Sequence, residues 1–313
     1  MPSTLADLVI PSEYKMTADG EDFLLYDRGP SDQRMLVFST VQSLRLLENS
    51  SDWFADGAFK VVPELFYQLY TIHSLALKTV IPCVYALLPN KHRATYQDLF
   101  HQLLTINPML NPKTFLIDYE QATRSAIEEV FPNATVKGCF YHLSQNIYRK
   151  VNLRDYKENI KLKIQMLPVL AFIPQGEVVY LVETMPPEAD PVMYFEDTYI
   201  GRQRRHNRRA PRFPVSTWNI YDRVAKGCHN QMQANITSFH PNIWKFLEVL
   251  KREQTLTNIT INQTIAGDPA PPKRKRYQDS TAIIATVEHD LENRHVLNFV
   301  RGIAPQLAIL VCV

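Results

Sequence analysis

The sequence has little cysteine and no marked excess of charge. The four cysteines, Cys83, Cys139, Cys228 and Cys312, lie far apart in 313 residues, and none belongs to a Cys-x-x-Cys pair. This spacing excludes a disulfide scaffold and a tetracysteine zinc module, and it fits a reducing compartment. With 34 Lys and Arg against 32 Asp and Glu, the net charge is +2. Any contact with a polyanion must therefore come from local clusters of charge.

Long apolar segments are also lacking. The first thirty residues contain several acids and no continuous apolar run, so we expect no secretory signal peptide. The apolar stretch at 307–313 is too short to span a bilayer. Apolar residues make up 45% and charged residues 21%, a balance typical of a globular protein that buries a core. We therefore expect a soluble intracellular protein with no membrane partner. The length of the chain predicts two domains, or one domain with an insertion.

The pattern of apolar residues predicts an α/β domain. Three consecutive runs rich in β-branched and aromatic residues predict an antiparallel meander, and alternating helices and strands follow it. This order is the ribonuclease-H-like arrangement, and it implies a mixed five-stranded sheet with flanking helices. The predicted strands are 53–62, 66–75, 79–88, 113–117 and 135–141, and the predicted helices are 95–106, with Thr95 as N-cap, 120–131 and 142–151.

The rest of the chain divides by composition. Its beginning is polar and mixed in charge, and a later stretch is rich in Thr, Asn, Pro and Lys. A short amphipathic helix is predicted at 35–47, and further helices at 218–224 and 240–254. We expect a disordered or partly ordered lead-in at 1–34, the ribonuclease-H-like core at 35–255 with a helical insertion at about 155–225, a basic flexible linker at 256–280, and a C-terminal helix and tail at 281–313.

Two aspartates are candidates for a metal site. Asp56 lies within the first strand of the predicted meander, and Asp118 directly follows the fourth strand. In the ribonuclease-H-like topology these strands are parallel neighbours, so the two carboxylates are expected to meet. Close carboxylates repel each other unless something compensates, and a pair of Mg²⁺ or Mn²⁺ ions does so while promoting phosphodiester chemistry. The local sequence is equally compatible with an Asp-Gly turn at Asp56 and a helix cap at Asp118.

Several motifs, in order along the chain, resemble the MULE (Mutator-like element) transposase domain. The resemblance implies a DDE-type enzyme that cleaves and joins DNA, with a ribonuclease-H-like core in which two Asp and one Glu hold Mg²⁺ or Mn²⁺. Asp56 and Asp118 match the first two acids, and so would be both catalytic residues and metal ligands. The matching motifs are 56–63, 66–73, 84–91, 118–120, 138–143, 194–201 and 209–218, so the resemblance covers roughly 35–255.

The chain departs from the family's pattern at its third acid. Where the family carries a Glu just ahead of a Trp-His pair, this chain runs Gly227-Cys228-His229, and about a dozen residues are absent. No acid lies between Arg223 and Glu248, and Glu248 is interpreted as a solvated position on an amphipathic helix. We therefore expect weakened metal binding and a transposase-derived protein that is inactive as it stands. The alternatives are a domesticated, non-catalytic nuclear DNA- or protein-binding module, and a gene-model or splicing artefact.

Cys139 and His142 match the family's Cys-x-x-His signature after the second Asp. The spacing is compatible with zinc, but a structural zinc site needs four ligands and no partner pair is visible. We favour a structural role for both residues.

Two segments are strongly basic. Residues 201–214 hold six arginines and no acid, which suits sequence-independent phosphate contacts; a solvated loop is the alternative. A second run, after two prolines, indicates a nuclear import signal. We therefore expect DNA as the partner and the nucleus as the location, and leave a homo-oligomer open. The aromatic residues are interpreted as core rather than as a base-stacking platform. The arginines are Arg202, Arg204, Arg205, Arg208, Arg209 and Arg212, and the import signal is Lys273, Arg274, Lys275 and Arg276.

Overall fold

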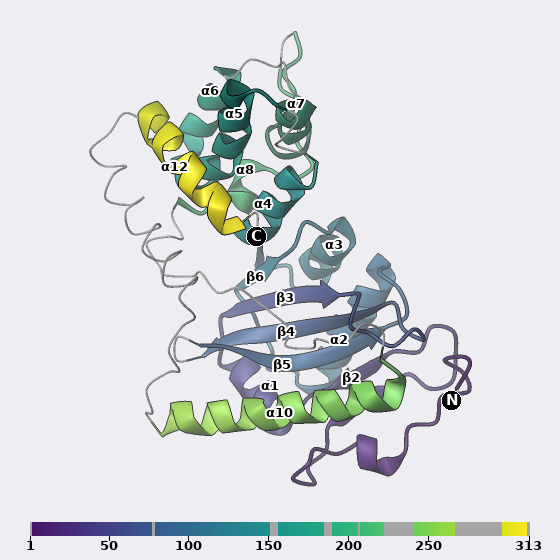
Figure 1. Ribbon diagram of the computed structural model, residues 1–313. Helices are drawn as coiled ribbons and strands as arrows, with labels where there is room; N and C mark the ends of the chain where they lie inside the picture. Colours follow the sequence, from purple (N-terminus) through teal and green to yellow (C-terminus); the bar gives the residue numbers. More distant parts are fainter. Residues whose placement is uncertain are drawn as a thin grey trace. The chain divides into compact units, whose positions relative to one another are not determined.

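The chain divides into two compact units (Figure 1). We call residues 1–136 and 232–271 the core unit, and residues 137–231 and 272–313 the helical unit. The computed structural model describes residues 2–76, 79–150, 156–184, 190–205, 207–221, 241–266 and 296–311.

A mixed β-sheet forms the centre of the core unit. In the described residues it has seven strands, in the order β1-β2-β5-β4-β3-β6-β7. Strands β3, β4 and β5 form the predicted antiparallel meander, and β6 runs parallel to β3. The five predicted strands are present as β3 to β7, and two further strands extend the sheet beyond β5. The strands are β1 (Leu24–Asp27), β2 (Leu36–Phe38), β3 (Asp52–Ala58), β4 (Gln68–Ala76), β5 (Thr79–Leu88), β6 (Thr114–Ile117) and β7 (Thr135–Gly138).

The single helix predicted at 35–47 is wrong. Its first part is β2, which pairs antiparallel with β5, and helix α1 (Val41–Glu48) begins only after it. Thr40 is the N-cap of α1, because its side chain accepts a hydrogen bond from the backbone N–H of Ser43. A short apolar run does not distinguish a buried strand from a buried helix, and Thr40 was the signal that separates them here.

The N-terminal segment, for which we expected little order, contributes to the core. Leu8 and Phe23 are each 1% exposed, and they belong to one apolar cluster with Phe38 and the first half of helix α10 (Ile243–Ile265). The helix α10 also corrects the predicted linker, because it continues through the first ten residues of 256–280. Residues 267–280, and with them the predicted import signal, lie outside the described residues.

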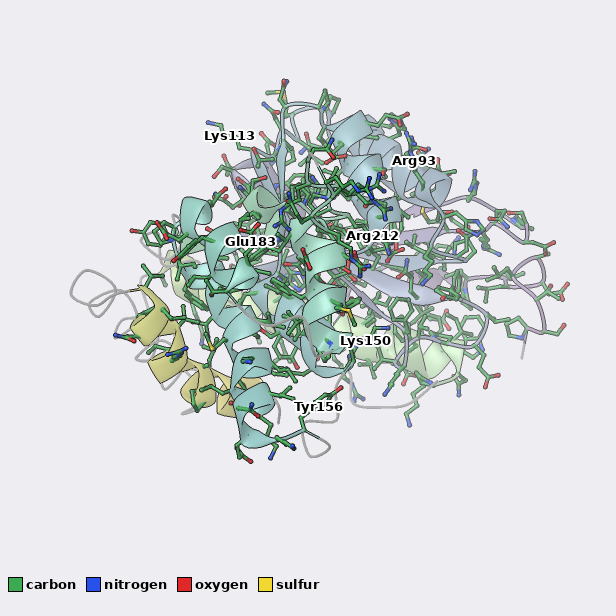
Figure 2. All side chains as sticks on the ribbon, turned by 90° about the horizontal axis from the view of Figure 1, so that it is seen from above. Arg93, Lys113, Lys150, Tyr156, Glu183 and Arg212 are labelled. Atoms are coloured by element: carbon green, nitrogen blue, oxygen red, sulfur yellow. The ribbon has the colours of Figure 1, made fainter. Side chains whose placement is uncertain are left out.

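Helices α1, α2 (Arg93–Ile106) and α3 (Gln121–Val130) pack on the sheet face opposite this cluster. The centre of this second cluster is Trp53, whose indole Nε1 donates hydrogen bonds to the carbonyls of Leu47 and Ser50. Its ring packs edge-on against Phe115 and Phe131. Helix α2 begins two residues before the predicted N-cap Thr95, and its N-cap position is His92. Figure 2 shows Arg93 at its first turn, where it pairs with Glu129 of α3.

The helical unit has its own aromatic core. Phe195, Tyr199 and Trp218 pack on one another, and the indole of Trp218 donates a hydrogen bond of 3.0 Å to the Tyr199 carbonyl. Helix α5 packs against α4 and α12. The start of the helix predicted at 218–224 is wrong, because α8 ends at Trp218 and Asn219 is extended. Residues 222–240, which include the Gly227–His229 junction, lie outside the described residues. The helices are α4 (Phe140–Tyr148), α5 (Glu158–Val169), α6 (Gln175–Glu183), α7 (Asp190–Phe195), the π-helical turn η4 (Glu196–Ile200), α8 (Val215–Trp218) and α12 (Val296–Val311).

No helix within the described ranges combines the length and the apolar character needed to cross a membrane.

Candidate functional site

The sheet register places Asp56 and Asp118 side by side. In the parallel pair of β3 and β6, Phe54 lies opposite Leu116. Asp56 stands two residues further along β3, and Asp118 stands two residues further along the chain, directly after β6. Side chains two residues apart in a strand point to the same face, and neighbouring strands lie about 4.8 Å apart. The two carboxylates therefore meet at one face of the sheet, at the carboxyl end of β6.

Neither the Asp-Gly turn nor the helix cap that the sequence also allowed is present at these two aspartates. Asp56 and Gly57 lie inside β3, so they do not form a turn, and the Asp56 carboxylate accepts a 2.8 Å hydrogen bond from the Gly57 N–H. Asp118 precedes α3, but the N-cap position of that helix is Glu120. The Asp118 carboxylate accepts a 3.1 Å bond from the Glu120 N–H, which holds the turn between β6 and α3. Each carboxylate is therefore oriented by a backbone N–H group that lies one or two residues after it.

Glu120 is a third acid close to this pair, and sequence reasoning did not select it. Its carboxylate accepts a 3.2 Å hydrogen bond from the Tyr96 hydroxyl. The oxygen of that hydroxyl accepts a 2.7 Å hydrogen bond from the side-chain amide of Gln68. Burial raises the pKa of Glu120, and the nearby Asp118 carboxylate raises it further. The spacing Asp-x-Glu after a buried strand was the signal available in the sequence.

The pKa of Tyr70 in β4 is raised in part by all three acids. Its side chain is 3% exposed, and its hydroxyl has no hydrogen-bond partner among the described residues. Burial raises the pKa of this phenol most, followed by Tyr96 and then by the carboxylates of Asp118, Glu120 and Asp56. A single buried hydroxyl is thus close enough to feel every acid of the cluster. Carboxylates gathered in this way favour a compensating cation.

Gly57 makes room for this arrangement. A Cβ atom at Gly57 would lie 2.7 Å from the side-chain oxygen of Gln68, which is closer than real Cβ contacts come. Glycine therefore lets Gln68 lie flat against β3 and reach Tyr96. The Asp-Gly pair serves the site through this close approach and not through a positive φ.

The described residues supply two candidate metal ligands, but not a complete set. Among them, no group of three or more His, Cys, Asp and Glu side chains is arranged to hold a metal ion. Glu248 lies exposed on α10, as its apolar neighbours in the sequence predicted. Asp56 and Asp118 fit a hard divalent cation by ligand type, because both offer carboxylate oxygens. Two carboxylates fit one loosely held ion better than two tightly held ones.

Cys139 and His142 belong to the helical unit. Cys139 is the N-cap residue of α4, and His142 lies in the first turn of that helix. Both side chains are half-buried, and Cys139 is a free cysteine. The described residues around them complete no metal-binding group. The interpretation of both residues as structural stays a prediction.

The six arginines lie on a loop whose backbone folds back on itself. We call residues 201–212 the arginine loop. The N–H of Arg209 donates to the carbonyl of Arg202 at 2.9 Å, and Gln203 pairs antiparallel with Arg208. The loop begins at Gly201, whose φ is +85°, and a Cβ there would lie 1.7 Å from the Arg209 carbonyl oxygen. Only glycine fits this position.

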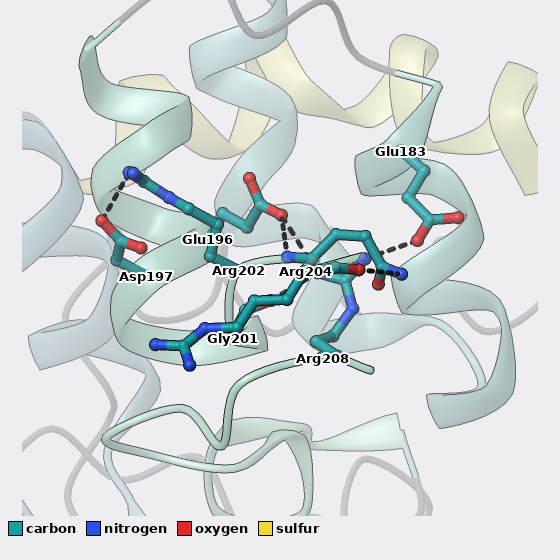
Figure 3. A network of polar contacts seen from close by, with 8 residues as sticks. Glu183, Glu196, Asp197, Gly201, Arg202, Arg204 and Arg208 are labelled. Atoms are coloured by element: carbon teal, nitrogen blue, oxygen red, sulfur yellow. Dashed lines mark hydrogen bonds and ion pairs between the residues drawn. The ribbon is translucent and has the colours of Figure 1, made fainter. Parts of the chain in front are cut away.

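The arginines differ in their contacts (Figure 3). Arg208 is 17% exposed, and its guanidinium pairs with Glu183 of α6 and Glu196 of η4 and also donates to the Gly201 carbonyl. Arg202 is half-exposed and pairs with Asp197. The remaining four are exposed, and Arg212, labelled in Figure 2, lies over the ring of Phe213. The loop therefore uses Arg208 internally and presents Arg204, Arg205, Arg209 and Arg212 to solvent.

We expect Arg208→Met to destabilise the protein by about 1–2 kcal/mol, because it leaves two carboxylates without their shared cation. The matched control is Arg202→Met, which removes an exposed pair and should cost less than about 0.5 kcal/mol. Urea unfolding of the two variants beside the wild type measures both values. Equal effects of the two substitutions would contradict the role assigned to Arg208.

A comparison with protein families finds a match for part of the chain. The fold is mixed α/β, with a mixed sheet in which Asp56 lies on β3 and Asp118 directly follows the parallel strand β6. Residues 53–146 match the model of the MULE transposase domain. The resemblance seen in the sequence is thereby confirmed for this stretch, which contains Asp56, Asp118, Cys139 and His142. No curated protein matches the chain.

Proposed function

We propose that the chain is a transposase-derived protein of Mutator-like elements that keeps the first two acids of a DDE-type site but not the third. The observation that carries this proposal is the register of β3 and β6, which brings Asp56 and Asp118 together within the matched domain. The strand order β5-β4-β3-β6-β7, with β3 antiparallel to β4 and parallel to β6, supports a ribonuclease-H-like core.

In this proposal Asp56 and Asp118 hold one Mg²⁺ or Mn²⁺ ion weakly. The ion would supply Lewis-acid stabilisation of a phosphodiester oxygen. The backbone N–H groups of Gly57 and Glu120 orient the two carboxylates, and the buried polar groups of Tyr96 and Gln68 fix Glu120 beside them. With no third acid between Arg223 and Glu248, the chain is expected to lack effective cleavage.

DNA is the proposed partner, and the nucleus the proposed location. The exposed arginines of the arginine loop are the proposed phosphate contacts, since Arg208 is occupied by Glu183 and Glu196. Contacts of this kind neutralise phosphates without reading sequence, and they weaken as salt rises. A non-catalytic DNA-binding module is the second candidate function, and the missing third acid is the observation that favours it.

Titration with Mn²⁺, followed by water-proton relaxation, tests the metal site directly. We expect the wild type to bind the ion weakly, and Asp118→Asn to lose most of that binding because it removes one of two charged ligands. Asp52→Asn is the matched control, since Asp52 begins the same strand that carries Asp56. Identical titrations of the wild type and Asp118→Asn would refute the proposed site.

A further inference from the structure

Two exposed aromatic rings lie in the connection between β3 and β4. Phe59 follows the end of β3, three residues after Asp56, and Tyr67 precedes the start of β4. Phe59 is 41% exposed, and Tyr67 is 45% exposed. The ring centroids lie 5.6 Å apart, and the ring planes meet at 80°, so the pair forms a corner. Among the exposed aromatic residues of the described chain, these two contact each other.

Positive charge accompanies this corner. The ammonium group of Lys91 lies 6.0 Å from the centre of the Tyr67 ring, and Lys60, next to Phe59, is exposed. Aromatic faces with a neighbouring cation suit a nucleotide, because the base stacks on the ring and its phosphate meets the ammonium group. A purely apolar protein partner would not need these lysines.

The corner lies close to chain segments that carry the acids. The ring of Phe59 comes within 3.7 Å of the position that a Cβ of Gly57 would occupy, and Gly57 is the neighbour of Asp56. Lys91 lies close enough to Glu120 for its charge to oppose the rise in that residue's pKa. Lys91 thus lies near the Asp118–Glu120 turn, whereas the Phe59 ring lies on the side of β3 that Gly57 faces, opposite to the side of the Asp56 carboxylate.

We propose that Phe59 and Tyr67 form a stacking site for an unpaired base of a DNA strand, with Lys91 contacting the adjacent phosphate. The proposal rests on the proposed DNA-related function of the core unit. It adds an unpaired strand as the ligand and assigns residues to its binding. It also revises the interpretation of the aromatic residues as core alone.

Fluorescence anisotropy in EDTA, at low salt, tests the site without any metal. The probes are a labelled blunt duplex and the same duplex with a short single-stranded extension. We expect the wild type to bind the extended duplex about tenfold more tightly. Phe59→Leu and Tyr67→Leu keep apolar bulk and remove the ring face, so each should abolish most of this preference. Tyr180→Leu, at an exposed aromatic of the helical unit, is the matched control and should keep it.

An extension with abasic sites in place of its bases separates stacking from charge. The wild type should bind it no better than the blunt duplex, and the two leucine variants should no longer distinguish bases from abasic sites. Lys91→Gln should weaken binding to both extensions alike. An unchanged preference in Phe59→Leu and Tyr67→Leu, or no preference in the wild type, would overturn the proposal. Because these measurements contain no metal ion, failure of the metal site and failure of the stacking site give different results.

Discussion

Supercoiled plasmid incubated with this chain and Mn²⁺ is expected to remain intact over times at which a repaired chain nicks it. The repaired chain carries the family's Glu-bearing segment between Gly227 and His229. Two-metal cleavage needs one ion to activate the attacking oxygen and another to stabilise the leaving oxygen. Asp56 and Asp118 alone fit one weakly held ion, so the difference in rate should amount to orders of magnitude.

Two substitutions in the repaired chain identify the site that acts. Asp118→Ala should abolish nicking, because it removes a carboxylate that the β3–β6 register places beside Asp56. Asp52→Ala, at the other end of β3, should leave nicking in place. Nicking by the chain as it stands, lost on Asp118→Ala, would mean that another residue supplies the third ligand. Glu120 would then be the first to test, by Glu120→Gln.

This experiment also separates the candidate functions. Activity in the repaired chain alone would mean that the core is intact and that the missing segment silenced it. Inactivity of both chains, with DNA binding retained, would favour the non-catalytic binding module. Sequencing the transcript across Gly227–His229 decides the remaining alternative, that the gap is a gene-model or splicing artefact.

The sequence predicted the Asp56–Asp118 pair because the pairing depends on topology. A meander followed by a parallel strand brings the first and fourth strands together, and runs of β-branched and aromatic residues mark those strands clearly. Glu120 was not predicted to join the pair. Its position depends on hydrogen bonds to Tyr96 of α2 and, through it, to Gln68 of β4, and neither is near it in the sequence.

The positions at which β3 ends and β4 begins explain why the exposed pair Phe59 and Tyr67 was not predicted. Strands were predicted at 53–62 and 66–75, which would have placed Phe59 and Tyr67 within the sheet. The structure ends β3 at Ala58 and begins β4 at Gln68, so both rings fall in the connection and remain exposed. Aromatic residues in a core and at a surface site look alike in a sequence. The contacts of the arginine loop could not be predicted from the sequence either, because the pairing of Arg208 with Glu183 and Glu196 depends on tertiary contacts.

The stability of the protein is expected to fall between pH 7 and pH 5 through one buried histidine. His73 of β4 lies opposite Phe54 of β3 and Pro82 of β5, and its Nδ1 is buried with no hydrogen-bond partner among the described residues. Burial lowers the pKa of His73 to about 4, against a weaker opposing effect of a hydrogen bond with the Phe54 backbone.

The sign of the effect follows from proton uptake. Below its ordinary pKa of about 6.5, His73 takes up a proton in the unfolded chain but stays neutral in the folded one until about pH 4. Acid therefore favours unfolding across this window, by about 2 kcal/mol at pH 5 relative to pH 7. For a unit of this size the loss corresponds to a fall in Tm of roughly 4–8 °C.

The variant His73→Gln isolates this contribution, because glutamine does not titrate and all other groups remain. Its free energy of unfolding should fall less than that of the wild type as the pH is lowered from 7 to 5, by about 2 kcal/mol. His101→Gln replaces an exposed histidine of α2, and it should follow the wild type throughout. Urea titrations at half-unit steps of pH give the three curves. Parallel curves for the wild type and His73→Gln would show that His73 takes up its proton equally in both states, and that β4 admits water next to the strand that carries Asp56.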